Sequence, residues 1–153
     1  MKIGVISDTH NYLDPGIAMA FEGVDHILHG GDIGLPWVIM ELESIAPVTA
    51  VLGNNDAGLD FKETEIIKLS DTRFLVQHIV NISSPGDPVH AQIQKAKPDV
   101  VIFGHSHKAF SEMREGVLFL NPGYAGKPRF NLSRSVAILE GSPGRLSIQF
   151  KAL

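Results

Sequence analysis

Short apolar stretches rich in valine and isoleucine recur along this chain of 153 residues. Each stretch is hydrophobic at consecutive rather than alternating positions, which is typical of strands buried on both faces of an α/β sheet. The pattern predicts buried strands at residues 3–6, 26–29, 48–52, 74–77 and 100–103.

Between these strands, apolar residues return at helical spacing, which predicts helices at 17–21, 37–45 and 89–96. Asp87 and Pro88 supply an N-cap and a first-turn proline for the last helix. The later part of the chain predicts antiparallel strands instead, within 109–120 around a turn at Glu115-Gly116, and at 135–139 and 145–151. We therefore expect an α/β fold in a single domain over residues 1–153.

Polar residues follow each predicted strand at the point where it ends. In α/β sheets, ligands bind just beyond the carboxyl ends of the strands. Taken singly, such residues are ordinary helix caps, turn residues or hydrogen-bonded histidines. Their joint occurrence after five strands favours a metal site, and the segments are Ser7-Asp8-Thr9-His10, His29-Gly30-Gly31-Asp32, Gly53-Asn54-Asn55-Asp56, His78 and Gly104-His105-Ser106-His107.

The order of these segments resembles that of the calcineurin-like metallophosphoesterases, whose pattern is D-x-H, G-D, G-N-[HNC]-[DE], a lone H and G-H-x-H. Asn121-Pro122-Gly123, Lys127-Pro128-Arg129 and the short chain are similar to the small bacterial and archaeal phosphodiesterases of that family. The resemblance implies two packed mixed β-sheets flanked by helices, a four-layer α-β-β-α sandwich.

The resemblance also implies a centre of two divalent transition-metal ions, with manganese expected and iron, nickel, cobalt or zinc as alternatives. The implied activity is hydrolysis of phosphodiesters by a hydroxide that bridges the two ions. Asp56 is expected to accept a hydrogen bond from a ligand or to order its loop. One ion would take Asp8, His10, His107 and a shared Asp32, and the other would take Asp32, Asn54, His78 and His105.

Two positions depart from the family pattern. Ile79 follows the lone histidine where glycine is common, which makes His78 the least secure of the seven ligands. Many relatives have histidine at position 55, where it can protonate the leaving group. Asn55 cannot act as an acid at neutral pH, so we expect it to hydrogen-bond a phosphate oxygen instead.

Other polar residues have open or structural interpretations. His29 is expected to pack or hydrogen-bond near the site rather than to bind metal, and His26 and His90 are expected to be structural. Arg129 is either a contact for the substrate phosphate or a surface residue.

The composition and net charge of the chain restrict the kinds of partner that we expect it to bind. The net charge is −4 and no basic cluster is present, which argues against a nucleic-acid surface. The absence of cysteine excludes disulfides and thiolate metal sites. No stretch has the length of a membrane span or a secretory signal, so a cytoplasmic protein is expected. The expected partner is a small-molecule phosphodiester, and a homo-oligomer is compatible with the sequence.

A second hypothesis is a protein-interaction scaffold on the same fold, as in the family's retromer subunit, which has lost catalytic ligands. The seven ligand types are all present in this chain, which favours the enzyme. A nuclease is a third hypothesis, disfavoured by the missing basic groove.

Overall fold

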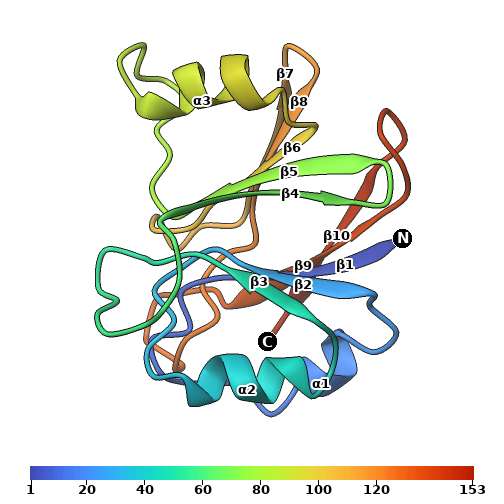
Figure 1. The fold of residues 1–153 in the computed structure, drawn as a ribbon. Helices are drawn as coiled ribbons and strands as arrows, with labels where there is room; N and C mark the ends of the chain where they lie inside the picture. The colour runs from blue at the N-terminus through green and yellow to red at the C-terminus, as the bar shows by residue number, and fades with distance from the viewer.

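The structure, a computed structural model, describes residues 1–153 and contains two five-stranded sheets packed face to face (Figure 1). The first sheet has the order β10-β9-β1-β2-β3, in which β1, β2 and β3 run parallel and β9 and β10 are antiparallel to their neighbours. Its strands are β1 (Lys2–Ile6), β2 (His26–His29), β3 (Val48–Ala50), β9 (Ser135–Glu140) and β10 (Ser147–Ala152).

The second sheet has the order β4-β5-β6-β8-β7, with β5, β6 and β8 parallel and an antiparallel strand at each edge. Its strands are β4 (Thr64–Leu69), β5 (Thr72–Gln77), β6 (Val100–Ile102), β7 (Phe110–Arg114) and β8 (Val117–Asn121). Both sheets are therefore mixed, as predicted.

Three helices cover the outer faces of the sheets. Figure 1 shows α1 (Ile17–Ala20) and α2 (Trp37–Glu43) on the outside of the first sheet, and α3 (Pro88–Ala96) on the outside of the second. This is the four-layer α-β-β-α arrangement that the family resemblance implied. The prediction of the fold class is confirmed.

Three hydrophobic cores fill the spaces between the four layers. Ile27 packs in the core under α1 and α2, whereas its neighbour Leu28 packs in the core between the sheets. In the second sheet, Val76 packs between the sheets and Leu75 packs under α3. Successive strand residues point to opposite faces, so a strand covered on both sides must be apolar at consecutive positions. This explains the continuous hydrophobic runs in the sequence.

The main difference from the prediction is β4, an edge strand that was not expected. Its Ile66 and Ile67 lie between Glu65 and Lys68, and the strand is only half-buried, so it lacks the apolar run of a central strand. The expected turn between β7 and β8 is present, and Glu115 and Gly116 have φ of 49° and 80°. Two consecutive positive φ angles are typical of the tight turns of two-residue hairpins.

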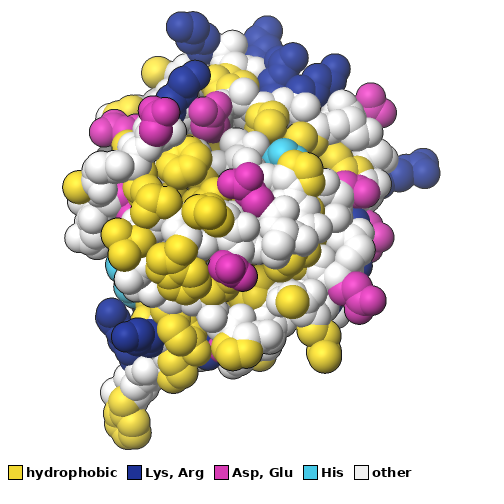
Figure 2. All heavy atoms as spheres, turned by 60° about the horizontal axis from the view of Figure 1, so that its bottom comes forward, with side chains coloured by type: hydrophobic (Ala, Val, Ile, Leu, Met, Phe, Trp, Pro, Cys, Tyr) yellow, Lys and Arg dark blue, Asp and Glu magenta, His cyan; other side chains and the backbone are white.

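Apolar side chains gather on the outer face of α1 and α2 (Figure 2), where Met19, Trp37 and Met40 are exposed. Exposed apolar groups of this kind often mark contacts between proteins. The homo-oligomer considered from the sequence stays a prediction. No helix in the chain combines the length and the apolar character needed to cross a membrane.

Candidate metal centre

The loops after β1 and β2 lie side by side and bring the two key aspartates together. The backbone nitrogen of Asp8 donates to the carbonyl oxygen of Gly31 at 2.9 Å, and that of His10 donates to the carbonyl oxygen of Asp32 at 2.9 Å. The parallel pairing of the two strands thus continues beyond their ends. Both carboxylates are consequently carried to the same edge of the sheet, where they are buried.

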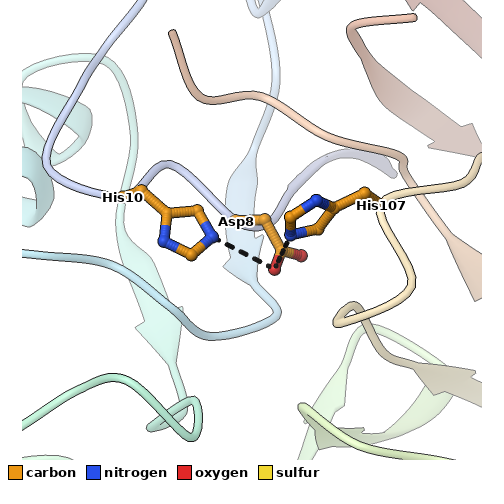
Figure 3. Close-up of side chains that lie close together, drawn as sticks. All are labelled: Asp8, His10 and His107. Atoms are coloured by element: carbon orange, nitrogen blue, oxygen red, sulfur yellow. Dashed lines mark ion pairs between the residues drawn. The ribbon is translucent and has the colours of Figure 1, made fainter. Parts of the chain in front are cut away.

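The two oxygens of Asp8 have different surroundings. Oδ2 accepts hydrogen bonds from the Ser7 hydroxyl at 2.7 Å and from the backbone nitrogen of His105 at 3.1 Å. Oδ1 has no hydrogen-bond donor and faces two imidazoles (Figure 3), with His107 Nε2 at 3.2 Å and His10 Nε2 at 3.7 Å. Oδ2 anchors the side chain, and Oδ1 is left for a cation.

Asp32 and His78 meet beside this group. His78 comes from the end of β5 in the second sheet, and its Nε2 lies 3.3 Å from Asp32 Oδ2 and 3.8 Å from Asp8 Oδ1. His10 Nε2 lies 3.7 Å from the same Asp32 oxygen. Asp32 is therefore positioned to contribute to two neighbouring cation sites.

These residues fit metal ions by their unsatisfied atoms and by their spacing. Asp8 Oδ1, His10 Nε2 and His78 Nε2 are buried and have no hydrogen-bond partner, although buried polar atoms normally have one. Two ligands of one ion with bonds of about 2.1 Å lie roughly 3.0–3.5 Å apart. The observed separations of 3.2–3.8 Å are close to that spacing. Two groups, Asp8–His10–His107 and Asp8–Asp32–His78, have ligand atoms within 4.8 Å of one another.

Asn54 and His105 extend the centre toward the surface. Both residues are exposed, and His105 Nδ1 lies 3.1 Å from Asn54 Oδ1. The His105 ring centroid is 5.4 Å from that of His78. All seven expected ligands therefore lie at one edge of the sandwich, after β1, β2, β3, β5 and β6, with Asn54 and His105 less closely grouped than the others.

Most of these ligands have a backbone conformation that L-residues seldom adopt. A positive φ costs a non-glycine residue on the order of 1 kcal/mol or more, and such strain gathers at functional sites. Five of the seven have it, namely Asp8 (57°), His10 (46°), Asp32 (54°), His105 (71°) and His107 (61°). The rest of the fold stabilises these strained loops, which is what a site built for a ligand requires.

Glycine is needed at two positions for space. A Cβ atom on Gly53 would lie 2.0 Å from Asp32 Oδ1, and one on Gly104 would lie 2.5 Å from Asp8 Oδ2. These glycines let the backbone approach the two carboxylates closely.

Asp56 orders two loops beside the centre. Its carboxylate accepts hydrogen bonds from the backbone nitrogens of Ile33 at 2.9 Å, Gly34 at 3.1 Å and Gly53 at 2.8 Å. It thereby ties the loop after β2 to the loop after β3. Of the two roles considered for Asp56 from the sequence, the structure shows this one.

Asn55 contacts Asp32 directly. Its backbone nitrogen donates to Asp32 Oδ1 at 2.9 Å, and its Nδ2 donates to Asp32 Oδ2 at 2.9 Å. Asn55 therefore orients the shared carboxylate, a contact that was not expected. The expected hydrogen bond to a phosphate oxygen stays a prediction, since Nδ2 carries a second hydrogen.

His29 is buried and uses both ring nitrogens within the protein. Its Nδ1 accepts from the backbone nitrogen of Gly31 at 3.1 Å, so Nε2 carries the proton and donates to Thr9 Oγ1 at 3.0 Å. Thr9 in turn donates to the Ile33 carbonyl at 2.8 Å. Burial lowers the pKa of His29 to about 4 despite nearby carboxylates, so the ring is neutral. His29 is not available as a metal ligand, in line with the sequence interpretation.

The other two histidines lie outside the centre. His26 Nε2 is 2.8 Å from Thr49 Oγ1, and His90 Nε2 is 2.9 Å from the Ser84 carbonyl. Both are half-buried and make local structural contacts, as expected.

Burial and neighbouring charges shift the pKa values of the residues in the centre in opposite directions. Burial alone would raise the pKa of Asp8, but His10, Ser7, His78 and His107 together hold this pKa below its usual value. Asp8 raises the pKa of His10 against the effect of burial. Burial lowers the pKa of His107, although Asp8 opposes this. An ionised Asp8 among imidazoles is the electrostatic environment that a divalent cation needs.

Three buried polar residues support the centre, although the sequence assigned no individual role to them. Asn121, at the end of β8, donates from Nδ2 to the Gly104 carbonyl and to Ser106 Oγ, both at 3.1 Å, and so holds the loop that carries His105 and His107. Ser7 and Thr9 hold the loop after β1. The sequence feature that could have identified these residues is a polar position at the end of an apolar strand.

Arg129 lies near the centre and has no ion-pair or hydrogen-bond partner for its side chain. Its guanidinium carbon is 5.4 Å from the ring centroid of Tyr124, and the Tyr124 ring is 4.8 Å from that of His107. The positive charge of Arg129 also contributes to lowering the pKa of His107, after burial and beside the charge of His10. An unpaired cation is thus placed at the rim of the site.

Comparison with known proteins agrees with this class of site. Residues 1–143 match the calcineurin-like phosphoesterase superfamily domain, and the chain belongs to this family of hydrolases. It is 34% identical over 143 residues to phosphodiesterase MJ0936 of Methanocaldococcus jannaschii. The aligned region covers 80% of this chain and 83% of that protein.

Solved structures show the same fold. The crystal structure described as a novel archaeal phosphodiesterase superposes with a TM-score of 0.80 at 28% identity and covers 100% of both chains. Vps29 of Entamoeba histolytica, in its complex with zinc, superposes with a TM-score of 0.77 at 23% identity and covers 100% of this chain and 98% of that one. The second likeness, at lower identity, concerns the fold alone.

Proposed function

We propose that this protein hydrolyses phosphodiesters at a centre of two divalent cations. The observation that carries the proposal is the group of buried atoms without partners, Asp8 Oδ1, His10 Nε2 and His78 Nε2, around a pair of aspartates. The name of the phosphodiesterase relative from Methanocaldococcus jannaschii supports the substrate class.

The proposed ligand sets are Asp8, His10, His107 and Asp32 for one cation, and Asp32, Asn54, His78 and His105 for the other. Divalent cations held by these residues would supply Lewis-acid chemistry, namely activation of water as the nucleophile and stabilisation of charge on the phosphate oxygens. Nitrogen and oxygen ligands without sulfur suit manganese, our first choice, as well as iron, nickel, cobalt or zinc.

The charge balance of the site favours an anionic ester. Asp8 and Asp32 are the only anionic residues among the seven ligands, so two divalent cations leave about two positive charges in excess. Arg129 adds another positive charge at the rim, and no carboxylate pairs with it. We propose that Arg129 contacts a phosphate oxygen of the substrate.

The chain offers no acid at position 55 to protonate a leaving alkoxide. Asn55 holds Asp32 in place instead. The proposed enzyme therefore acts best on esters whose leaving group departs without a proton. The proposed partner is a small-molecule phosphodiester, and a cytoplasmic location stays a prediction.

The test is hydrolysis of bis(4-nitrophenyl) phosphate by protein loaded with manganese, with a chelated sample as the control. We expect turnover that depends on the metal. Protein that contains about two equivalents of metal and hydrolyses neither diesters nor monoesters would instead support the scaffold hypothesis.

A further inference from the structure

A cleft of about 360 Å³ opens directly beside the metal centre. Asn54 and His78, two of the proposed ligands, form part of its wall. Other parts of the wall come from the start of β4, the end of β5 and the first turns of α3, which contribute Thr64, Gln77 and Gln92. A group attached to a phosphate at the centre can therefore enter this cleft without crossing solvent.

The wall of the cleft is uncharged over most of its surface. Glu63 is its only acidic residue, and the wall has no lysine or arginine. A second phosphate or carboxylate would find no cation there. Two of the ten lining residues are hydrophobic, and the polar side chains among the others offer hydrogen-bonding atoms beside apolar surface. The lining therefore fits an uncharged group that has both carbon atoms and hydrogen-bonding atoms.

Three side chains in the wall form a fixed network. Gln77 Oε1 accepts from Thr64 Oγ1 at 2.7 Å and from Gln92 Nε2 at 2.8 Å. Gln77 Nε2 donates to the Ile79 carbonyl at 3.2 Å. These contacts determine which end of the Gln77 amide is oxygen and which is nitrogen. The network leaves a second hydrogen on each amide nitrogen and lone pairs on the Thr64 hydroxyl for a ligand.

Gln92 supplies a second, independent observation. Its Oε1 is buried and has no hydrogen-bond donor in the protein. Of the five side-chain atoms in this condition, three belong to the metal centre and one is Gln92 Oε1, in the adjacent cleft. Buried acceptors normally have a donor, so Gln92 Oε1 is available to a ligand hydroxyl once a small shift of the side chain exposes it to the cleft.

We propose that this cleft binds one of the two alcohol groups of the phosphodiester, and that this group is a neutral alcohol with further hydroxyl groups, of the size of glycerol or a sugar. The proposal rests on the proposed function, because the phosphate at the metal centre is what brings the alcohol to the cleft. The network of Thr64, Gln77 and Gln92 recognises the hydroxyl groups.

The test is calorimetric titration of the manganese-loaded protein with two phosphonate esters that are not hydrolysed, glyceryl methylphosphonate and propyl methylphosphonate. The two esters carry the same charge and differ only in two hydroxyl groups. We expect the glyceryl ester to bind about tenfold more tightly, since one or two net hydrogen bonds correspond to that ratio. Gln92→Leu should bring the ratio close to one.

Gln94→Leu is the matched control, because it makes the same change on the same helix at an exposed position outside this cleft and should keep the wild-type ratio. Circular dichroism checks that each variant is folded. Should Gln92→Leu fail to fold, Thr64→Val removes one hydroxyl of the network and should lower the ratio in the same direction.

The titration does not depend on turnover, so it separates this proposal from the proposed function. Hydrolysis of bis(4-nitrophenyl) phosphate is measured in parallel on the same samples. Equal binding of the two esters by the wild-type protein, or an unchanged ratio in folded Gln92→Leu, overturns the proposed cleft even if the protein is an active diesterase. If neither ester binds, the proposed cleft is overturned as well.

Discussion

His78 Nδ1 lies 2.7 Å from the carbonyl oxygen of Gly30, across the interface between the two sheets. A carbonyl only accepts hydrogen bonds, so Nδ1 must carry the ring proton. In the neutral ring, Nε2 then carries the lone pair, and this nitrogen faces Asp8 and Asp32. The backbone of one sheet thus prepares a histidine of the other sheet for a metal, as hydrogen bonds to the second ring nitrogen commonly do.

The first prediction concerns the number of metal ions that His78 helps to hold. We expect the wild-type protein to bind about two equivalents of manganese. His78→Ala should retain about one, because Asp8, His10 and His107 form a group without it. Metal analysis after reconstitution measures this, with His90→Ala as the control on α3. A metal content near zero in the wild-type protein would contradict the metal proposal. Two equivalents in His78→Ala would exclude His78 as a ligand.

The second prediction concerns Asp32, which lies between His78 and His10. Asp32→Asn removes one negative charge from the proposed bridge, so both cations should bind more weakly. We expect kcat/KM for a diester to fall on the order of a thousandfold and the metal content to drop below one equivalent. Asp60→Asn is the matched control at an exposed position. Full activity and metal content in Asp32→Asn would rule out the bridging role.

Much of the fold and the candidate site could be predicted from the sequence because both depend on buried strands. A strand covered on two faces has to be apolar throughout, so Val100–Ile102 stands out, and the polar residues that follow it mark its end. Parallel neighbours end at one edge, so the ligand residues after them had to be close in space.

Features that depend on contacts between distant residues could not be predicted. The edge strand β4 has only two consecutive apolar residues, between Glu65 and Lys68, and is recognised only by its pairing with β5. Likewise, nothing near Asn55 in sequence shows that its amide reaches Asp32, 23 positions earlier. The space that Gly104 leaves for the Asp8 carboxylate is also a property of the folded structure.

The third prediction concerns the pH dependence of stability through His29. The pKa of this buried ring is about 4 in the folded protein, against 6.5 for a histidine exposed to water. Between these two values the unfolded chain binds the proton and the folded protein does not, so stability is lost as the pH falls from about 6.5 to about 4. A difference of that size corresponds to about 3 kcal/mol.

Chemical denaturation of metal-free protein at pH 7 and pH 4 measures this loss. His29→Gln, whose amide does not titrate, should lose about 3 kcal/mol less than the wild type between the two conditions. His90→Gln serves as the comparison, since it removes a histidine that is only half-buried. Equal losses in wild type and His29→Gln would show that His29 is protonated in the folded state.

The fourth prediction concerns Arg129, whose charge has no partner in the protein. Arg129→Met retains the length of an unbranched side chain and removes the charge. If the guanidinium contacts the substrate phosphate, KM for a diester should rise about three- to tenfold, and the effect should shrink at high salt. Steady-state kinetics at two ionic strengths measures this, with Arg145→Met as a control on the loop before β10. An unchanged KM would leave Arg129 as a surface residue.

The last prediction concerns Asn55 and the leaving group. An alkoxide needs a proton or a metal to depart, whereas nitrophenolate leaves readily because its charge is delocalised. A general acid typically contributes about a hundredfold or more to such a step, and an asparagine cannot supply it. We therefore expect rates with a series of diesters to fall steeply as the pKa of the leaving group rises.

Two variants at this position separate the roles of its side chain. Asn55→His should flatten the dependence on the leaving group if the imidazole reaches the departing oxygen. Asn55→Ala should leave the slope unaltered and reduce metal or substrate binding, because it removes the hydrogen bond to Asp32 Oδ2. The competing explanation is that another group, such as a water at the metal centre, donates the proton. A wild-type rate nearly independent of leaving-group pKa, with the chemical step shown to be rate-limiting, would decide for that explanation.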